Sequence, residues 1–110
     1  MELYAEYLKE REGISIIVKD FGFCSYKIID DYIYLVDIYI KKEKRRTGLA
    51  KDFIEEVSDI GKENNCNSIL GGFCLDTINW KGGKTLLKHC GFKYFEKQQK
   101  TNMIFVIKEL

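Results

Sequence analysis

Apolar and polar residues alternate along most of the first forty residues, and this alternation predicts β-strands. Three stretches, Gly13–Lys19, Phe21–Ile29 and Tyr32–Lys41, are rich in Ile, Val, Tyr and Phe. The short turns Lys19-Asp20 and Asp30-Asp31 separate them. The pattern therefore predicts an antiparallel meander of three strands.

The first ten residues fit two patterns. Leu3, Ala5 and Tyr7 would share one side of a strand, although the segment 2–8 would also form a short helix. We predict a further strand at this position.

From Gly48 onward the apolar residues recur with the period of a helix. One face of this predicted helix carries the apolar side chains Leu49, Phe53, Ile54, Val57 and Ile60. Charged residues occupy the other face, and Asn64-Asn65 closes the helix.

The remaining chain predicts one strand, one helix and two further strands. The strand is expected over Ser68–Leu75 and the helix over Trp80–His89, with Gly91 as its C-terminal cap. The last strands are expected over Phe92–Phe95 and Met103–Ile107. This order predicts an α/β (α+β) fold with a mixed, mostly antiparallel, twisted sheet of six or seven strands and two main helices.

Composition narrows the class of protein. The 110 residues predict one domain over 1–110, and 45% hydrophobic residues predict a packed core. The net charge is only +1, which argues against a general polyelectrolyte partner for nucleic acid. No signal peptide, long apolar run or lipidation motif is visible, so we expect no membrane association and a cytoplasmic location. The four cysteines lack zinc-site spacing, and a single histidine excludes a multi-histidine metal centre.

A cationic turn joins the third predicted strand to the predicted helix that begins near Gly48. Residues 41–46 carry five Lys or Arg side chains, interrupted only by Glu43. The first N–H groups of a helix lack intrahelical partners and present partial positive charge, so they stabilise an anion. Gly48 and Ala50 leave these amides accessible, because larger side chains would hold a pyrophosphate away from them. The pattern predicts a phosphate site built from backbone.

The spacing Arg45-x-x-Gly48-x-Ala50 resembles the Arg/Gln-x-x-Gly-x-Gly/Ala signature of the GNAT N-acetyltransferase superfamily. The segment from Asn79 to Phe92 is similar to a later family segment that carries an asparagine, a small residue and Gly-Phe. Together the two resemblances cover residues 32–95, and they identify the chain as a minimal member with a short N-terminal region.

The resemblance implies acetyl-coenzyme A as cosubstrate, without a metal. It implies that the coenzyme contacts the end of a strand, the turn, the start of the helix and an asparagine. These implied coenzyme-binding residues are Ile38, Tyr39, Ile40, Arg45, Arg46, Thr47, Gly48, Leu49, Ala50, Lys51 and Asn79.

The implied reaction is acyl transfer from a thioester to a primary amine. The amine must be neutral to attack, so a proton acceptor is needed, together with donors for the oxyanion. Backbone N–H groups near Ile38–Ile40 are expected as oxyanion donors. The candidate bases are Asp37, inside an otherwise apolar strand, and Asp76, directly after the neighbouring strand. Their alternative roles are a cross-strand polar contact or a solvated face residue for Asp37, and the N-cap of the following turn for Asp76.

The position of the family tyrosine that often acts as general acid falls on Leu87. Four other side chains are candidate proton donors to the leaving thiolate: Tyr34, His89, Cys90 and Tyr94. A coenzyme thiolate also leaves without a dedicated acid, because a thiol pKa is only about 8.5.

The short N-terminal region predicts an open acceptor groove. An open groove suits a protein lysine or an N-terminus better than a small polyamine or an aminoglycoside, which would have to be enclosed. A second copy of the chain, in a homodimer, is the alternative way to close the groove.

Two alternative functions compete with an acetyltransferase. A degenerate acyl-coenzyme A binder without turnover would fit Leu87 and would fit Asn79, which stands one residue before Trp80, the position of the family asparagine. A small nucleic-acid-binding module would use the cationic turn, although no aromatic residue interleaves its charges. A P-loop reading of Gly83-Lys84-Thr85 fails, because Ile78 stands where that motif requires glycine.

Overall fold

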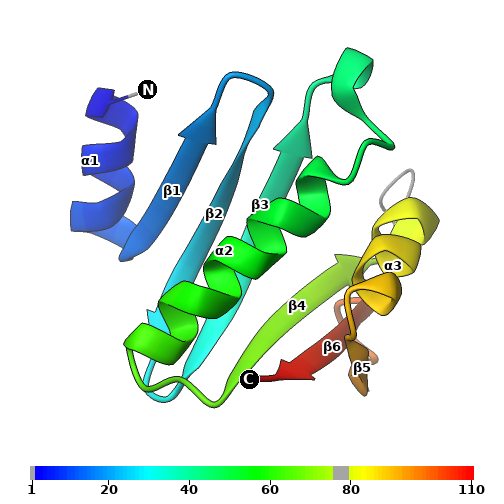
Figure 1. Cartoon of the computed structure of the whole chain (residues 1–110). Helices are drawn as coiled ribbons and strands as arrows, with labels where there is room; N and C mark the ends of the chain where they lie inside the picture. Colours follow the sequence, from blue (N-terminus) through cyan, green and yellow to red (C-terminus); the bar gives the residue numbers. More distant parts are fainter. Residues whose placement is uncertain (1, 76–79) are drawn as a thin grey trace.

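The computed structural model describes residues 2–75 and 80–110 (Figure 1). The N-terminal half contains the helix α1 and three strands, followed by a single 3₁₀ turn and the long helix α2. The bounds are α1 Glu2–Glu12, β1 Ile14–Lys19, β2 Gly22–Ile29, β3 Tyr32–Ile40, the 3₁₀ turn Lys42–Lys44 and α2 Leu49–Glu63. The C-terminal half contains β4 Ser68–Cys74, α3 Trp80–His89, β5 Lys93–Gln98 and β6 Met103–Glu109.

The prediction of a strand over the first ten residues is wrong, because this segment forms α1. The segment is rich in Glu, Leu, Ala, Lys and Arg and contains no β-branched residue, a composition that favours helix. Gly13, with φ of 68°, follows the helix and donates its N–H to the Lys9 carbonyl. The described chain thus has three α-helices, one more than the two main helices expected.

The six strands of the described chain form one mixed sheet in the order β1-β2-β3-β4-β6-β5. All neighbours are antiparallel except β3 and β4, which run parallel and are connected through α2. The predicted meander β1-β2-β3 and the mostly antiparallel α/β fold are confirmed. Apart from the strand expected over the first ten residues, every predicted strand and both predicted helices occur, with ends shifted by up to three residues.

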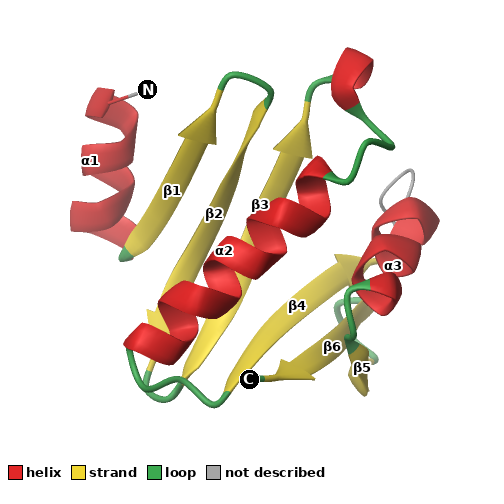
Figure 2. Cartoon of the chain, in the orientation of Figure 1, coloured by secondary structure: helices red, strands yellow, loops and turns green. Residues whose placement is uncertain are grey.

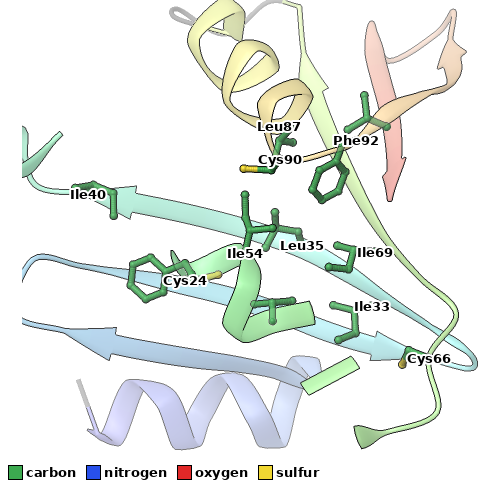
Figure 3. Close-up of a cluster of buried hydrophobic side chains, with 13 residues drawn as sticks. Cys24, Ile33, Leu35, Ile40, Ile54, Cys66, Ile69, Leu87, Cys90 and Phe92 are labelled. Carbon is green, nitrogen blue, oxygen red and sulfur yellow. The ribbon is translucent and has the colours of Figure 1, made fainter. Parts of the chain in front are cut away.

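The core lies on one face of the sheet, where α2 and α3 both pack (Figure 2). Phe53, Ile54 and Val57 of α2 are fully buried there, against Ile33 of β3 and Ile69 of β4. Leu87 of α3 and Cys90, directly after this helix, extend the same cluster toward Phe92 (Figure 3). The core therefore fixes the starts of α2 and α3 relative to β3 and β4, between which the candidate site lies. No helix in the described ranges is long and apolar enough to cross a membrane.

Candidate active site

The strands β3 and β4 separate partway along their length. They pair only from Tyr32–Ser68 to Tyr34–Leu70, after which β3 continues to Ile40. A β-bulge in β3 begins at the point of separation, because Leu35 pairs with Tyr26 and Asp37 pairs with Ser25, leaving Val36 as the extra residue. A bulge locally increases strand twist, which explains why β3 diverges from β4 here.

The separated strands form the sides of a cleft of about 1080 Å³. On β4, the cleft is lined by Gly71 and Gly72, which carry no side chain into it. The lining residues of β3 run from Leu35 to Ile40, and the turn, α2 and α3 complete the cleft. Five cations line the cleft, namely Lys44, Arg45, Arg46, Lys51 and Lys81. Among the described residues, Asp37 is the only carboxylate in the lining, so the cleft suits an anionic ligand.

Side-chain hydrogen bonds hold the turn between β3 and α2. The Arg45 Nε–H donates to the Ile40 carbonyl oxygen at 2.8 Å, and the guanidinium lies 5.7 Å from the ring centre of Tyr39. The Thr47 hydroxyl donates to the Lys44 carbonyl oxygen at 2.6 Å. The turn is therefore fixed by contacts to its own backbone and to the end of β3.

The helix α2 begins toward the cleft without a side-chain cap. Gly48 is its N-cap residue and its carbonyl accepts the Asp52 N–H at 3.1 Å, but no side chain within residues 2–75 and 80–110 caps the first free amides. Gly48 has φ of 84°, in the left-handed region, whereas an added Cβ would meet no atom within 4 Å. The backbone conformation therefore favours glycine here. The uncapped amides leave donors for an anion.

Most of the residues predicted to bind coenzyme line this one cleft. The lining includes Ile38, Tyr39, Ile40, Arg45, Arg46, Gly48, Leu49, Ala50 and Lys51. Thr47 is not in the lining, because its hydroxyl bonds to the turn instead. Asp37 lines the cleft from the bulge, whereas Asp76 and Asn79 lie outside the described residues.

Sequence reasoning pointed to the segment 79–92 through its resemblance to the family, but it named neither the glycines of β4 nor the cleft-lining residues at the start of α3. Gly71 and Gly72 interrupt an otherwise apolar strand, and paired glycines in a buried strand signal a close approach of another group. Lys81, Gly82, Gly83, Thr85 and Leu86 line the cleft from α3. The small residues at the start of this helix are the signal that could have indicated its role.

The candidate proton donors are not equivalent in position. His89 lines the cleft, while Tyr94 is exposed on the edge strand β5. Cys90 is buried, and burial raises the pKa of its thiol. Burial likewise raises the pKa of Tyr34, which is not in the cleft lining. Leu87, at the position of the family tyrosine, is buried in the core and also lines the cleft.

Comparison with known proteins gives one family match. A family model described as "Acetyltransferase (GNAT) family" matches residues 1–92. No match was found among proteins of curated function.

Solved structures of similar fold include three complexes with coenzyme. PaiA N-acetyltransferase of Thermoplasma acidophilum, in complex with coenzyme A, matches with a TM-score of 0.78 at 19% identity, over 99% of this chain and 70% of that one. An acetyltransferase of Bacillus subtilis in complex with CoA matches with a TM-score of 0.69 at 15% identity, over 96% and 83%. A GNAT family acetyltransferase of Elizabethkingia anophelis with acetyl-CoA bound matches with a TM-score of 0.75 at 17% identity, over 99% and 82%. These likenesses are evidence for the fold.

Proposed function

Because the chain belongs to the GNAT acetyltransferase family, an acyltransferase family, we propose that it transfers an acetyl group from acetyl-coenzyme A to a primary amine on a protein. The amine is a lysine side chain or an N-terminus. The observation that carries the proposal is the cleft between β3 and β4, which the uncapped start of α2 faces. The complexes of the three similar structures with coenzyme A or acetyl-CoA give it further support.

The donor site of this proposal joins three parts of the cleft. The pyrophosphate would accept hydrogen bonds from the amides of residues 48–51, which no side chain caps. Arg46 and Lys51 would add long-range attraction for the phosphates. The acyl-bearing arm would lie between β3 and β4, where Ile38–Ile40 and the side-chain-free Gly71 and Gly72 leave room. Asn79, which lies outside the described residues, completes the proposed coenzyme contacts, and Thr47 contributes by holding the turn rather than by lining the cleft.

The proposed reaction is a direct attack of the amine on the thioester. The nitrogen lone pair forms the new C–N bond, and the carbonyl electrons move onto oxygen, where backbone N–H groups of β3 stabilise them. When the carbonyl re-forms, the C–S bond breaks and the thiolate leaves. Asp37 accepts the proton that the amine loses, directly or through water, because it is the carboxylate at the bulge. Asp76 is the second candidate for this role.

A coenzyme binder without turnover is the second candidate function. It is favoured by Leu87, an apolar side chain buried at the position where the family resemblance implies a tyrosine. An acyl-coenzyme A binder would occupy the same cleft but would release no free thiol in the presence of any amine.

The test is a calorimetric titration of the protein with acetyl-coenzyme A, with coenzyme A and with ATP. We expect micromolar binding of both coenzymes and much weaker binding of ATP, followed by amine-dependent thiol release and acetylated peptide by mass spectrometry. Failure of both coenzymes to bind would overturn the proposal. Binding without acetyl transfer to any amine would favour the second candidate.

A further inference from the structure

One face of the sheet carries neither α2 nor α3, and we call it the outer face. The register between β1, β2 and β3 places its side chains in rows, because directly paired residues point to the same side of a sheet. One row is Val18, Phe23 and Tyr39, and the next is Ile16, Ser25 and Asp37. None of these six side chains belongs to the core cluster under α2 and α3. The helix α1 lies beside β1 at the edge of the sheet (Figure 1).

The outer face is strongly apolar and partly open to solvent. Val18, Val36 and Tyr39 expose 48%, 40% and 46% of their surface. The rings of Phe23 and Tyr39 stack across the strands with their centres 5.7 Å apart. A contiguous apolar surface on the outside of a protein usually marks a site of interaction.

The outer face is continuous with the candidate active site. Val36, Asp37 and Tyr39 line the cleft between β3 and β4, and the bulge turns both Val36 and Asp37 toward the outer face. Leu35 and Ile38, on either side of them, pack on the core side. An acceptor that lies on the outer face therefore reaches Asp37 without crossing the core.

The charges near Asp37 restrict the kind of amine that fits. On the three strands of the meander, the row beyond Asp37 carries Lys27, which pairs with Tyr34. The cleft adds five cations and no second carboxylate from the described residues. A polyamine needs several carboxylates to balance its charges, whereas a single lysine needs one. The lysine stem and its apolar neighbours would cover the stacked rings and Val18.

We propose that the outer face is the docking surface of the acceptor, and that the acceptor is a protein segment whose lysine lies between apolar residues. This inference rests on the proposed function and deepens it. Asp37 meets the amine, and the row of Val18, Phe23 and Tyr39 selects the apolar neighbours.

The test compares acceptors and variants at fixed acetyl-coenzyme A. Two peptides of equal length present one lysine, flanked by Val and Phe in the first and by Ser and Asn in the second, and spermidine serves as the polycation. Val18→Lys places a charge in the selecting row, at a residue that is not part of the cleft lining. Ile28→Lys is the matched control, because Ile28 is also an exposed aliphatic residue, at 39%, but lies on the core side, where it pairs with Ile33.

We expect kcat/KM for the apolar-flanked peptide to exceed that for the other two acceptors by tenfold or more. Val18→Lys should lower kcat/KM for the apolar-flanked peptide about tenfold without changing the Kd of coenzyme A. Ile28→Lys should leave this kcat/KM within twofold of the wild-type value. Equal use of both peptides, a preference for spermidine, or no effect of Val18→Lys would overturn the inference. So would a wild-type dimer in sedimentation that Val18→Lys dissociates, since a second copy would then cover the outer face. Loss of coenzyme binding in the wild type would instead overturn the proposed function itself.

Discussion

The Nε–H of Arg45 donates a 2.8 Å hydrogen bond to the carbonyl oxygen of Ile40, the last residue of β3. This bond joins the end of the strand to the turn that leads into α2. The guanidinium also lies over the ring of Tyr39, so the side chain holds the turn in addition to adding charge.

Arg45→Lys should therefore weaken coenzyme binding although it keeps the positive charge. Lysine has no donor at the Nε position and no planar group to lie over the ring of Tyr39. We expect the free energy of unfolding to fall by about 1 kcal/mol, and the Kd of acetyl-coenzyme A to rise about fivefold, by calorimetry. Arg46→Lys is the control for charge, and a loss of binding equal to that of Arg45→Lys would contradict a positioning role.

Gly48→Val should abolish coenzyme binding while the core stays folded. The φ of 84° is strained for any side chain, most of all for a β-branched one, and the Cβ would stand beside the free amides of α2. Unchanged affinity in calorimetry would show that the start of α2 does not bind the phosphates.

Gly82→Ala is expected to stabilise the fold, in contrast to any substitution of Gly48. Gly82 lies inside α3, and an added Cβ meets no atom within 4 Å. Alanine should raise the free energy of unfolding by about 0.5–1 kcal/mol, because it restricts the unfolded chain and favours helix. Urea denaturation of Gly82→Ala and Gly48→Val measures the two free energies of unfolding. Destabilisation by Gly82→Ala would mean that α3 needs glycine for another reason.

Asp37→Asn should slow acetyl transfer about 100-fold without changing the Kd of acetyl-coenzyme A. The amide keeps the size of the side chain but no longer accepts the proton of the amine. The rate difference between the variant and the wild type should shrink as the pH approaches and passes about 10.4, where half of a lysine amine is neutral in solution. A deficit that stays constant from pH 7 to pH 10.5 would argue that Asp37 has only a structural role.

Cys24 should make the folded protein less stable at alkaline pH. Burial, with smaller contributions from the nearby charges of Glu56 and Asp37, raises the pKa of this thiol from 9.0 to about 12. Between these values the unfolded chain loses the thiol proton and the native chain keeps it, so the free energy of unfolding falls as pH rises. The slope from this thiol is at most about 1.4 kcal/mol per pH unit.

Cys24→Ala is the matched variant for this dependence. It should be less stable near pH 7, since it leaves a cavity in the core, but its stability should decline less steeply between pH 9 and pH 11. Equal slopes in denaturation experiments would show that the native thiol ionises as readily as the unfolded one.

Local patterns in the sequence predicted most of the fold because most elements bury a distinct apolar face. The helix α2 places Phe53, Ile54 and Val57 on the core side, and the meander alternates as half-buried strands do. The helix α1 escaped this reasoning because none of its residues is buried, so it has no apolar stripe to detect. Its helix propensity was the remaining signal, and the alternation of Leu3, Ala5 and Tyr7 obscured it.

The candidate site was predictable only where it is local in the chain. The turn from Arg45 to Ala50 is one short signature, and it does line the cleft apart from Thr47. The separation of β3 from β4 depends on the bulge at Val36. This bulge arises from the way β3 pairs with β2, and the residues of β3 alone do not indicate it. The contribution of α3 depends on how the core places this helix against β4. The resemblance over residues 79–92 pointed to this segment, but the packed structure shows which of its residues line the cleft.

The limited pairing of β3 with β4 has a consequence for the order of folding. The hairpins β1-β2, β2-β3 and β5-β6 join segments that are adjacent in sequence. By contrast, β3 and β4 are separated in the chain by α2, and only three residue pairs connect them. Contacts between distant segments form late, because closing the long loop costs entropy before any pairing offsets it. We expect the two halves of the sheet to form separately and to join last along β3 and β4, so that the cleft is the final part of the molecule to take shape.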